Sequence, residues 1–217
     1  MAQSRRGEIL EVAAKIFNEK GYQSATLEDV GDHFGFTRAA LYYYFKNKQA
    51  ILDAIVDDAS ETLLVSLRAI LDAELPPAEC LRRIVVNHVV VLHSRPHVFG
   101  VFLAEPTSLP EQIRERMEQM EREYIDLVAA VYDSGVRAGQ FSADFPTKIA
   151  ILLILGMANN TKRWLHPATV ESGRIDPEAL AQMLFDMVSG GFSGKRARGR
   201  SAARGSAPGS VAALRRA

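Results

Sequence analysis

Apolar residues recur every three to four positions through most of this 217-residue chain, and this spacing restricts its fold class. Near the amino terminus the spacing is shown by Ile9, Val12, Ala13, Ile16 and Phe17. A period of 3.6 residues is that of one face of an α-helix, whereas a half-buried strand alternates with a period of two. No run of Val, Ile and Thr alternates in that way between hairpin turns. The sequence therefore predicts an all-α protein.

Glycine and proline residues mark the ends of the expected helices. Gly21 and Gly35 follow the first two apolar stripes, where glycine commonly ends a helix. Pro177 has the position of a first helical residue. Residues 26–29, Thr-Leu-Glu-Asp, have the form of a capping box with Thr26 as the N-cap. We expect about nine helices: a short segment between Pro96 and Pro106, and helices over residues 4–20, 26–34, 38–44, 48–71, 77–93, 110–135, 147–165 and 177–190.

The formal net charge of zero conceals an uneven distribution of charge. Residues 1–50 carry seven Lys or Arg against six Asp or Glu, residues 51–192 carry twelve against twenty, and residues 193–217 carry seven against none. The last segment is also rich in Gly, Ala and Ser, so we expect a disordered basic tail. Three roles stay open for it: solubility, an electrostatic tether to DNA, or a partner for acidic surfaces.

Several classes of protein are excluded. Cys80 is the single cysteine, so no intramolecular disulfide can form and a reducing compartment is favoured. We expect no secretory signal, because residues 1–20 have no continuous apolar core. The longest apolar run, residues 149–158, is far shorter than the roughly 20 residues that span a bilayer. His88, His93 and His97 lie close in sequence, but a proline interrupts their helical face and no carboxylate has ligand spacing. We expect a cytoplasmic protein that is not an enzyme and has no metal, cofactor or membrane partner.

Residues 36–45, Phe-Thr-Arg-Ala-Ala-Leu-Tyr-Tyr-Tyr-Phe, form an expected helix with an unusual exposed face. Leu41 and Phe45 lie four positions apart and make its apolar stripe. The other face carries tyrosines, small residues and one arginine, where a surface helix usually carries charge. Two short helices joined by a turn with glycine, and backed by a third helix, make a helix-turn-helix. Its second helix lies in the major groove of DNA.

These residues carry a resemblance to a known family. Gly21-Tyr22, residues 26–30, residues 35–45 and Lys48 resemble, in order and spacing, the amino-terminal domain of tetracycline-repressor (TetR) family transcriptional regulators. The resemblance covers about residues 5–60. It implies a DNA-binding domain over residues 1–50, a helical ligand-binding and dimerisation domain over residues 51–192, and the tail over residues 193–217. The expected DNA-contact residues are Thr26, Thr37, Arg38, Ala39, Ala40, Tyr42, Tyr43, Tyr44 and Lys48.

The chemistry of these side chains suggests different roles. Thr26 and Lys48 are candidates for phosphate contacts, and Thr26 is also a plain N-cap. Arg38 can grip guanine with two hydrogen bonds or bind phosphate, and the sequence leaves both roles open. We expect Tyr42 and its neighbour Tyr43 to reach phosphates, while the third tyrosine either joins them or packs beneath the helix.

The expected helix over residues 147–165 is apolar nearly all round, so it needs partners on more than one side. The resemblance implies that it forms a homodimer with residues 177–190, as a four-helix bundle across a two-fold axis. A dimer presents two recognition helices, which suits a pseudo-palindromic operator. The alternative is an internal core helix in a monomer.

A cavity is expected in the middle domain. The aromatic and apolar candidates to line it are Phe99, Phe102, Tyr124 and Leu127, although for each one taken alone ordinary core is the favoured role. Residues 159–167, Asn-Asn-Thr-Lys-Arg-Trp-Leu-His-Pro, are similar to the Arg-Trp-Tyr-x-Pro ending of TetR-type regulators of lipid and steroid catabolism that sense acyl-CoA. In that interpretation Arg163 and Lys162 meet the phosphates of CoA, beside Asn160 and Trp164. The alternative is a helix end where cations are favoured by the helix dipole.

The predicted function is that of a dimeric repressor of transcription. A small-molecule effector, an acyl-CoA or another apolar ligand, would release it from double-stranded operator DNA. The alternative is a DNA-binding dimer that acts as an activator or an architectural protein without an effector. A void among the middle helices would favour the first function, and a filled core the second.

Overall fold

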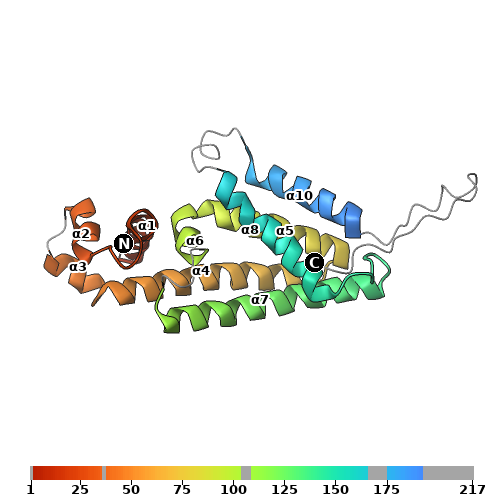
Figure 1. The fold of residues 1–217 in the computed structure, drawn as a ribbon, viewed down its shortest axis with the longest axis horizontal. Coiled ribbons are helices and arrows are strands. Elements are labelled where there is room, and N and C mark those ends of the chain that lie inside the picture. Colours follow the sequence, from red (N-terminus) through yellow and green to blue (C-terminus); the bar gives the residue numbers. More distant parts are fainter. Residues whose placement is uncertain (1, 36–37, 104–108, 166–174, 193–217) are drawn as a thin grey trace, which may run out of the picture.

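The computed structural model describes residues 2–35, 38–103, 109–165 and 175–192, and these residues form helices and no strand (Figure 1). The helices are α1 (Ala2–Lys20), α2 (Leu27–Phe34), α3 (Arg38–Tyr44), α4 (Lys48–Leu71), α5 (Pro77–Ser94), α6 (Pro96–Phe102), α7 (Glu111–Arg137), α8 (Thr147–Trp164) and α10 (Pro177–Phe192). The all-α prediction is confirmed. The predicted helix ends differ from the observed ones by a few residues, since α1 begins at Ala2 and α10 continues to Phe192.

The first three helices pack around a small core at one end of the molecule (Figure 1). Ile9 and Phe17 of α1, Val30 of α2 and Leu41 of α3 are buried in one hydrophobic cluster. Gly35 ends α2 with a left-handed backbone, at a φ of 62°, which glycine adopts without steric cost. This tight end turns the chain directly toward α3, so that the two short helices can share one core.

α4 connects this end of the molecule to the rest. It is a single helix of 24 residues that runs along the long axis (Figure 1). Its buried residues continue from Ile51 to Leu67 without a break in the hydrophobic cluster. The domain boundary expected after residue 50 therefore falls within the first turn of α4.

α5 is the central helix of the remaining part. It contacts α4, α7, α8 and α10, and its buried residues include Leu81, Ile84, Val85 and Leu92. α10 packs on α5 and α8, on the side of the molecule away from α4 (Figure 1). The arrangement leaves space between α4, α5, α7 and α8, which is where the candidate pocket lies.

Arg95, between α5 and α6, joins α1 to α4 and to the start of α6. Its guanidinium donates hydrogen bonds to the carboxylates of Glu11 in α1 and Asp58 in α4. Close by, the side-chain amide of Asn18 in α1 donates to the backbone oxygen of His97 in α6, at 2.8 Å. A Cβ added to Gly100 of α6 would lie 2.6 Å from that amide nitrogen. α6 is thus packed against α1 with no space between them.

We predict that Arg95→Met lowers the free energy of unfolding by about 2 kcal/mol, because two partly buried carboxylates lose the cation that they share. Urea denaturation followed by circular dichroism measures this change. Arg83→Met is the matched control, since Arg83 pairs with Glu79 on the surface at 2.9 Å and should contribute at most about 0.5 kcal/mol. Equal losses in the two variants would contradict a special role for Arg95.

Candidate DNA-contact surface and effector pocket

The exposed face of α3 is built from tyrosines. Leu41 and Phe45 are buried, as predicted, and they fix which face of the helix points to solvent. Tyr42 is 40% exposed and Tyr43 is 82% exposed. Tyr44 is half-buried, packs against the core, and meets the Tyr43 ring edge-on at 5.2 Å between centroids. Tyr42 and Tyr43 are therefore exposed on this face, while Tyr44 packs against the core. The phosphate contacts of the two exposed tyrosines stay predictions.

The start of α3 is less fully described. Thr37 lies outside the described residues, and so do the side chains of Arg38 and Ala39. Ala40 is half-buried. The DNA contacts expected from these positions stay predictions.

Thr26 caps α2 as the sequence predicts. Its hydroxyl accepts from the Asp29 backbone N–H at 3.1 Å, and the Asp29 carboxylate accepts from the Thr26 N–H at 2.9 Å. Lys20 also donates to this carboxylate at 2.6 Å. These hydrogen bonds hold the pKa of Asp29 down at about 2, with the Lys20 contact as the largest cause. These hydrogen bonds therefore fix the start of α2. In a helix-turn-helix, the first of the two helices crosses the DNA backbone.

Lys48 is bound to the loop between α1 and α2. Its ammonium donates to the backbone oxygens of Tyr22, Gln23 and Ala25, at 2.7, 3.1 and 2.8 Å. It also lies 4.5 Å from the centre of the Tyr22 ring, within range of a cation–π interaction. An ammonium has three N–H groups, so all of them are used within the chain. Lys48 therefore fastens the α1–α2 loop to the start of α4. Its contact with a DNA phosphate stays a prediction.

We predict that Lys48→Met lowers the free energy of unfolding by about 2 kcal/mol, since three loop carbonyls lose a charged donor. Chemical denaturation of the variant measures the loss. Lys46→Met, two residues away and exposed, is the control and should change stability by less than about 0.5 kcal/mol. Unchanged stability of Lys48→Met together with weaker DNA binding would contradict this structural role and favour the phosphate contact.

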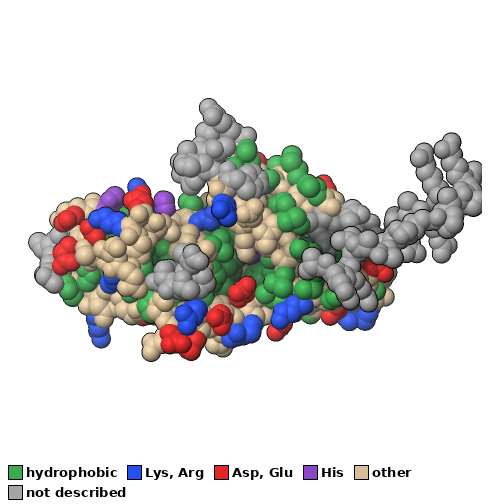
Figure 2. Space-filling model, in the orientation of Figure 1, with side chains coloured by type: hydrophobic (Ala, Val, Ile, Leu, Met, Phe, Trp, Pro, Cys, Tyr) green, Lys and Arg blue, Asp and Glu red, His purple; other side chains and the backbone are tan. Residues whose placement is uncertain are grey.

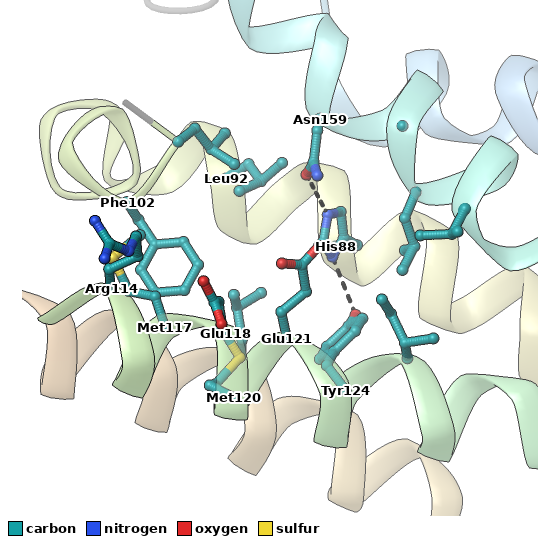
Figure 3. A pocket seen from close by; sticks show the side chains of 16 residues that line it. His88, Leu92, Phe102, Arg114, Met117, Glu118, Met120, Glu121, Tyr124 and Asn159 are labelled. Atoms are coloured by element: carbon teal, nitrogen blue, oxygen red, sulfur yellow. Dashed lines mark hydrogen bonds between the residues drawn. The ribbon is translucent and has the colours of Figure 1, made fainter. Parts of the chain in front are cut away.

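A cavity of about 250 Å³ lies between α4, α5, α7 and α8 (Figure 3). Its walls are mostly apolar, with Phe102 and Met117 at one end and Leu155 among the residues of α8. Glu118 and Glu121 stand on the α7 wall and are exposed to solvent. The complete lining is Leu63, His88, Leu92, Phe102, Leu103, Arg114, Met117, Glu118, Met120, Glu121, Tyr124, Ile125, Leu152, Leu155, Gly156 and Asn159. The expected void in the middle domain is thus present.

Three polar side chains from three helices meet in the wall of this cavity. His88 of α5 lies 3.1 Å through Nδ1 from the Tyr124 hydroxyl of α7, and 2.8 Å through Nε2 from Oδ1 of Asn159 in α8 (Figure 3). Burial lowers the pKa of His88, and the hydrogen bond to Asn159 opposes this shift only in part. Burial likewise raises the pKa of Tyr124 far above its usual value. Both groups are therefore neutral at physiological pH.

A second hollow opens beside the cavity and is lined by positively charged side chains. Lys162 and Arg163 line it together with Asn160, and it shares Leu103, Gly156 and Asn159 with the cavity. Its volume is about 490 Å³. Lys162 donates to the Pro96 backbone oxygen at the start of α6, and burial lowers its pKa to about 8. We refer to this hollow as the cationic cleft.

The structure brings together only some of the residues that were expected to bind a ligand. Phe102 and Tyr124 line the cavity, and Asn160 and Arg163 line the cationic cleft. Phe99 is fully buried, and Leu127 packs against the core; neither lines the cavity. The side chain of Trp164 lies outside the described residues. His88 and Asn159 also belong to the site but were not predicted as ligand-binding residues. In the sequence His88 suggests at most a metal ligand, and no local pattern joins it to Asn159.

Two further findings concern the described part of the chain alone. It has no group of three His, Cys, Asp or Glu side chains that could hold a metal ion. None of its helices is long and apolar enough to cross a membrane.

Comparison with known proteins agrees with this architecture. Residues 9–55 match the model of bacterial regulatory proteins of the tetR family, and residues 74–192 match the tetracyclin repressor-like C-terminal domain. The HTH-type transcriptional repressor KstR2 of Mycobacterium tuberculosis is 25% identical over 88% of this chain and 94% of its own length. The HTH-type transcriptional regulator TtgR of Pseudomonas putida is 26% identical over 76% of this chain and 81% of its own.

Solved structures show the same fold. The structure of ketosteroid transcriptional regulator KstR2 of M. tuberculosis superposes with a TM-score of 0.79 at 24% identity, covering 87% of this chain and 95% of that one. The TetR family regulator PfmR of Thermus thermophilus superposes with a TM-score of 0.72 at 28% identity, covering 83% of this chain and 93% of that one. The two matched models span the helix-turn-helix and most of the helices that enclose the cavity. The chain therefore belongs to the tetR family of bacterial regulatory proteins.

Proposed function

We propose that this regulator is a homodimeric repressor that leaves its operator when a small molecule occupies the cavity. The cavity is the observation that supports this proposal. α4 contributes to the cavity wall and runs from there to the end of the molecule that holds α1, α2 and α3. A filled core would have favoured an activator or an architectural protein without an effector. As a member of a family of transcriptional regulators, the chain is not an enzyme.

An unpartnered apolar surface on α8 and α10 supports the homodimer. One side of α8 is buried, but Ile149, Leu152, Leu153 and Met157 on its other side are exposed. Met183 and Met187 of α10 are exposed as well, the latter to 75%. Figure 2 shows hydrophobic side chains gathered over these two helices. A contiguous apolar patch of this kind marks a protein–protein interface, and a two-fold axis would bury it as a four-helix bundle.

We predict that Leu153→Glu produces a monomer, because a two-fold axis would place two carboxylates in one apolar interface. Sedimentation measures the oligomeric state, and fluorescence anisotropy measures binding to an operator selected from random DNA by this protein. Binding should weaken at least about 100-fold, since each monomer then engages one half-site. Val65→Glu is the control, because Val65 is 59% exposed on α4 and should leave the dimer intact. A dimeric Leu153→Glu protein would place the interface elsewhere.

The proposed effector joins an apolar body to an anionic head. The cavity offers an apolar wall, and the adjoining cleft offers Lys162 and Arg163, with Asn159 between them. An acyl-CoA has both parts, which agrees with the similarity of residues 159–167 to regulators that sense such thioesters. The effector would favour a conformation in which α4 moves the two α3 helices out of register with successive major grooves.

We predict that a CoA thioester raises the melting temperature and releases the operator in a screen of CoA thioesters, free fatty acids and aromatic acids. Arg163→Met should weaken binding of the thioester about 10-fold, because it removes one charge-assisted contact to the head group. Arg137→Met, at the end of α7 and outside both hollows, is the control. Equal affinity of the thioester for free and operator-bound dimer would contradict release by the effector.

A further inference from the structure

The chain of hydrogen bonds from Tyr124 through His88 to Asn159 is a polar element within a mostly apolar cavity wall (Figure 3). We call these three residues the relay. They come from α7, α5 and α8, so their meeting is a product of the tertiary fold. Buried polar groups of this kind are costly unless they are satisfied, and a cavity that only held hydrocarbon would not need them.

The direction of the hydrogen bonds in the relay is fixed by His88. A neutral imidazole has one N–H group and one lone pair, on different nitrogens. Oδ1 of Asn159 only accepts, so Nε2 of His88 donates to it, and Nδ1 accepts from the Tyr124 hydroxyl. If the Asn159 amide turns over, the whole relay reverses, because Nε2 then accepts and Nδ1 donates to the phenol oxygen.

In either direction one end of the relay offers a donor to a ligand and the other end offers an acceptor. In the first direction the Asn159 NH₂ donates and the Tyr124 oxygen accepts; in the reverse direction their roles exchange. Within the described part of the chain, neither side chain has a hydrogen bond beyond those to His88. Both side chains line the cavity, and Asn159 also lines the cationic cleft. A ligand that extends from one hollow into the other therefore passes the relay.

We propose that the relay selects effectors that carry a hydroxyl group on their apolar body, placed between Tyr124 and Asn159. A hydroxyl donates and accepts at once, so it satisfies both ends of the relay in either direction. An ether oxygen or a carbonyl accepts only and leaves one end unpaired. This inference rests on the proposed effector site and adds the chemical group that the site reads.

The test uses two isomers with the same number of heavy atoms, 1-octanol and 1-methoxyheptane. Their binding to the full-length protein is measured by NMR titration, with the labelled methyl groups of Met117 and Met120 in the cavity as reporters. The wild-type protein should bind the alcohol about 10-fold more tightly, because only the alcohol makes a hydrogen bond to each end of the relay.

Two variants and one control connect this preference to the relay. In Asn159→Leu and in Tyr124→Phe an apolar side chain of similar size replaces one end and covers the nitrogen of His88 that this end had bonded. The remaining end can turn to serve an ether as well as an alcohol, so the ratio of affinities should fall below about 2. Arg137→Met is the control, since Arg137 lies at the end of α7 and lines neither hollow, and its ratio should stay near about 10.

Two results would overturn the proposal. One is equal binding of the alcohol and the ether by the wild-type protein. The other is a preference that survives both relay substitutions, which would assign it to the carboxylates of Glu118 and Glu121 on the same wall. The titration needs no operator. An alcohol preference without operator release by any ligand would therefore confirm the relay while contradicting the proposed repressor function.

Discussion

The junction around Arg95 is the constraint on which the rest of the molecule depends. Without it, the α1–α3 end would be attached mainly through α4, and a single helix can bend or rotate against its neighbours. Arg95 bonds to Glu11 and Asp58 at once, and so fixes α1, α4 and the start of α6 with respect to one another. The position of the α3 tyrosines is therefore set by contacts made far from α3.

The features of this fold that could be predicted from the sequence are those that depend on residues close together in the chain. Gly35 and the Thr26 capping box act within a few residues, so their structural outcome follows from the sequence itself. The buried stripe of α3 was predictable for the same reason, since Leu41 and Phe45 are one helical turn apart. Elements of this kind account for the helices and for the face that α3 presents.

The remaining features depend on contacts between distant segments. Lys48 has the spacing of a DNA contact in the sequence, yet its ammonium is taken up by carbonyls of a loop more than 20 residues earlier. His88 and Asn159 are 71 residues apart, and no local pattern joins them. Phe99 and Phe102 look alike in sequence, but only the latter faces the cavity, because the rotation of a seven-residue helix decides between them.

α6 contacts both the cavity and α1, and so connects the cavity to the end of the molecule that holds α1, α2 and α3. Phe102, at its last turn, faces the cavity, while its first turn is tied to Lys162 through the Pro96 oxygen and to Asn18 through the His97 oxygen. The close approach of Gly100 to Asn18 leaves no free volume between α6 and α1. A close-packed contact transmits a displacement instead of absorbing it. A ligand that moved Phe102 would therefore act on α1 directly, in addition to any effect on α4.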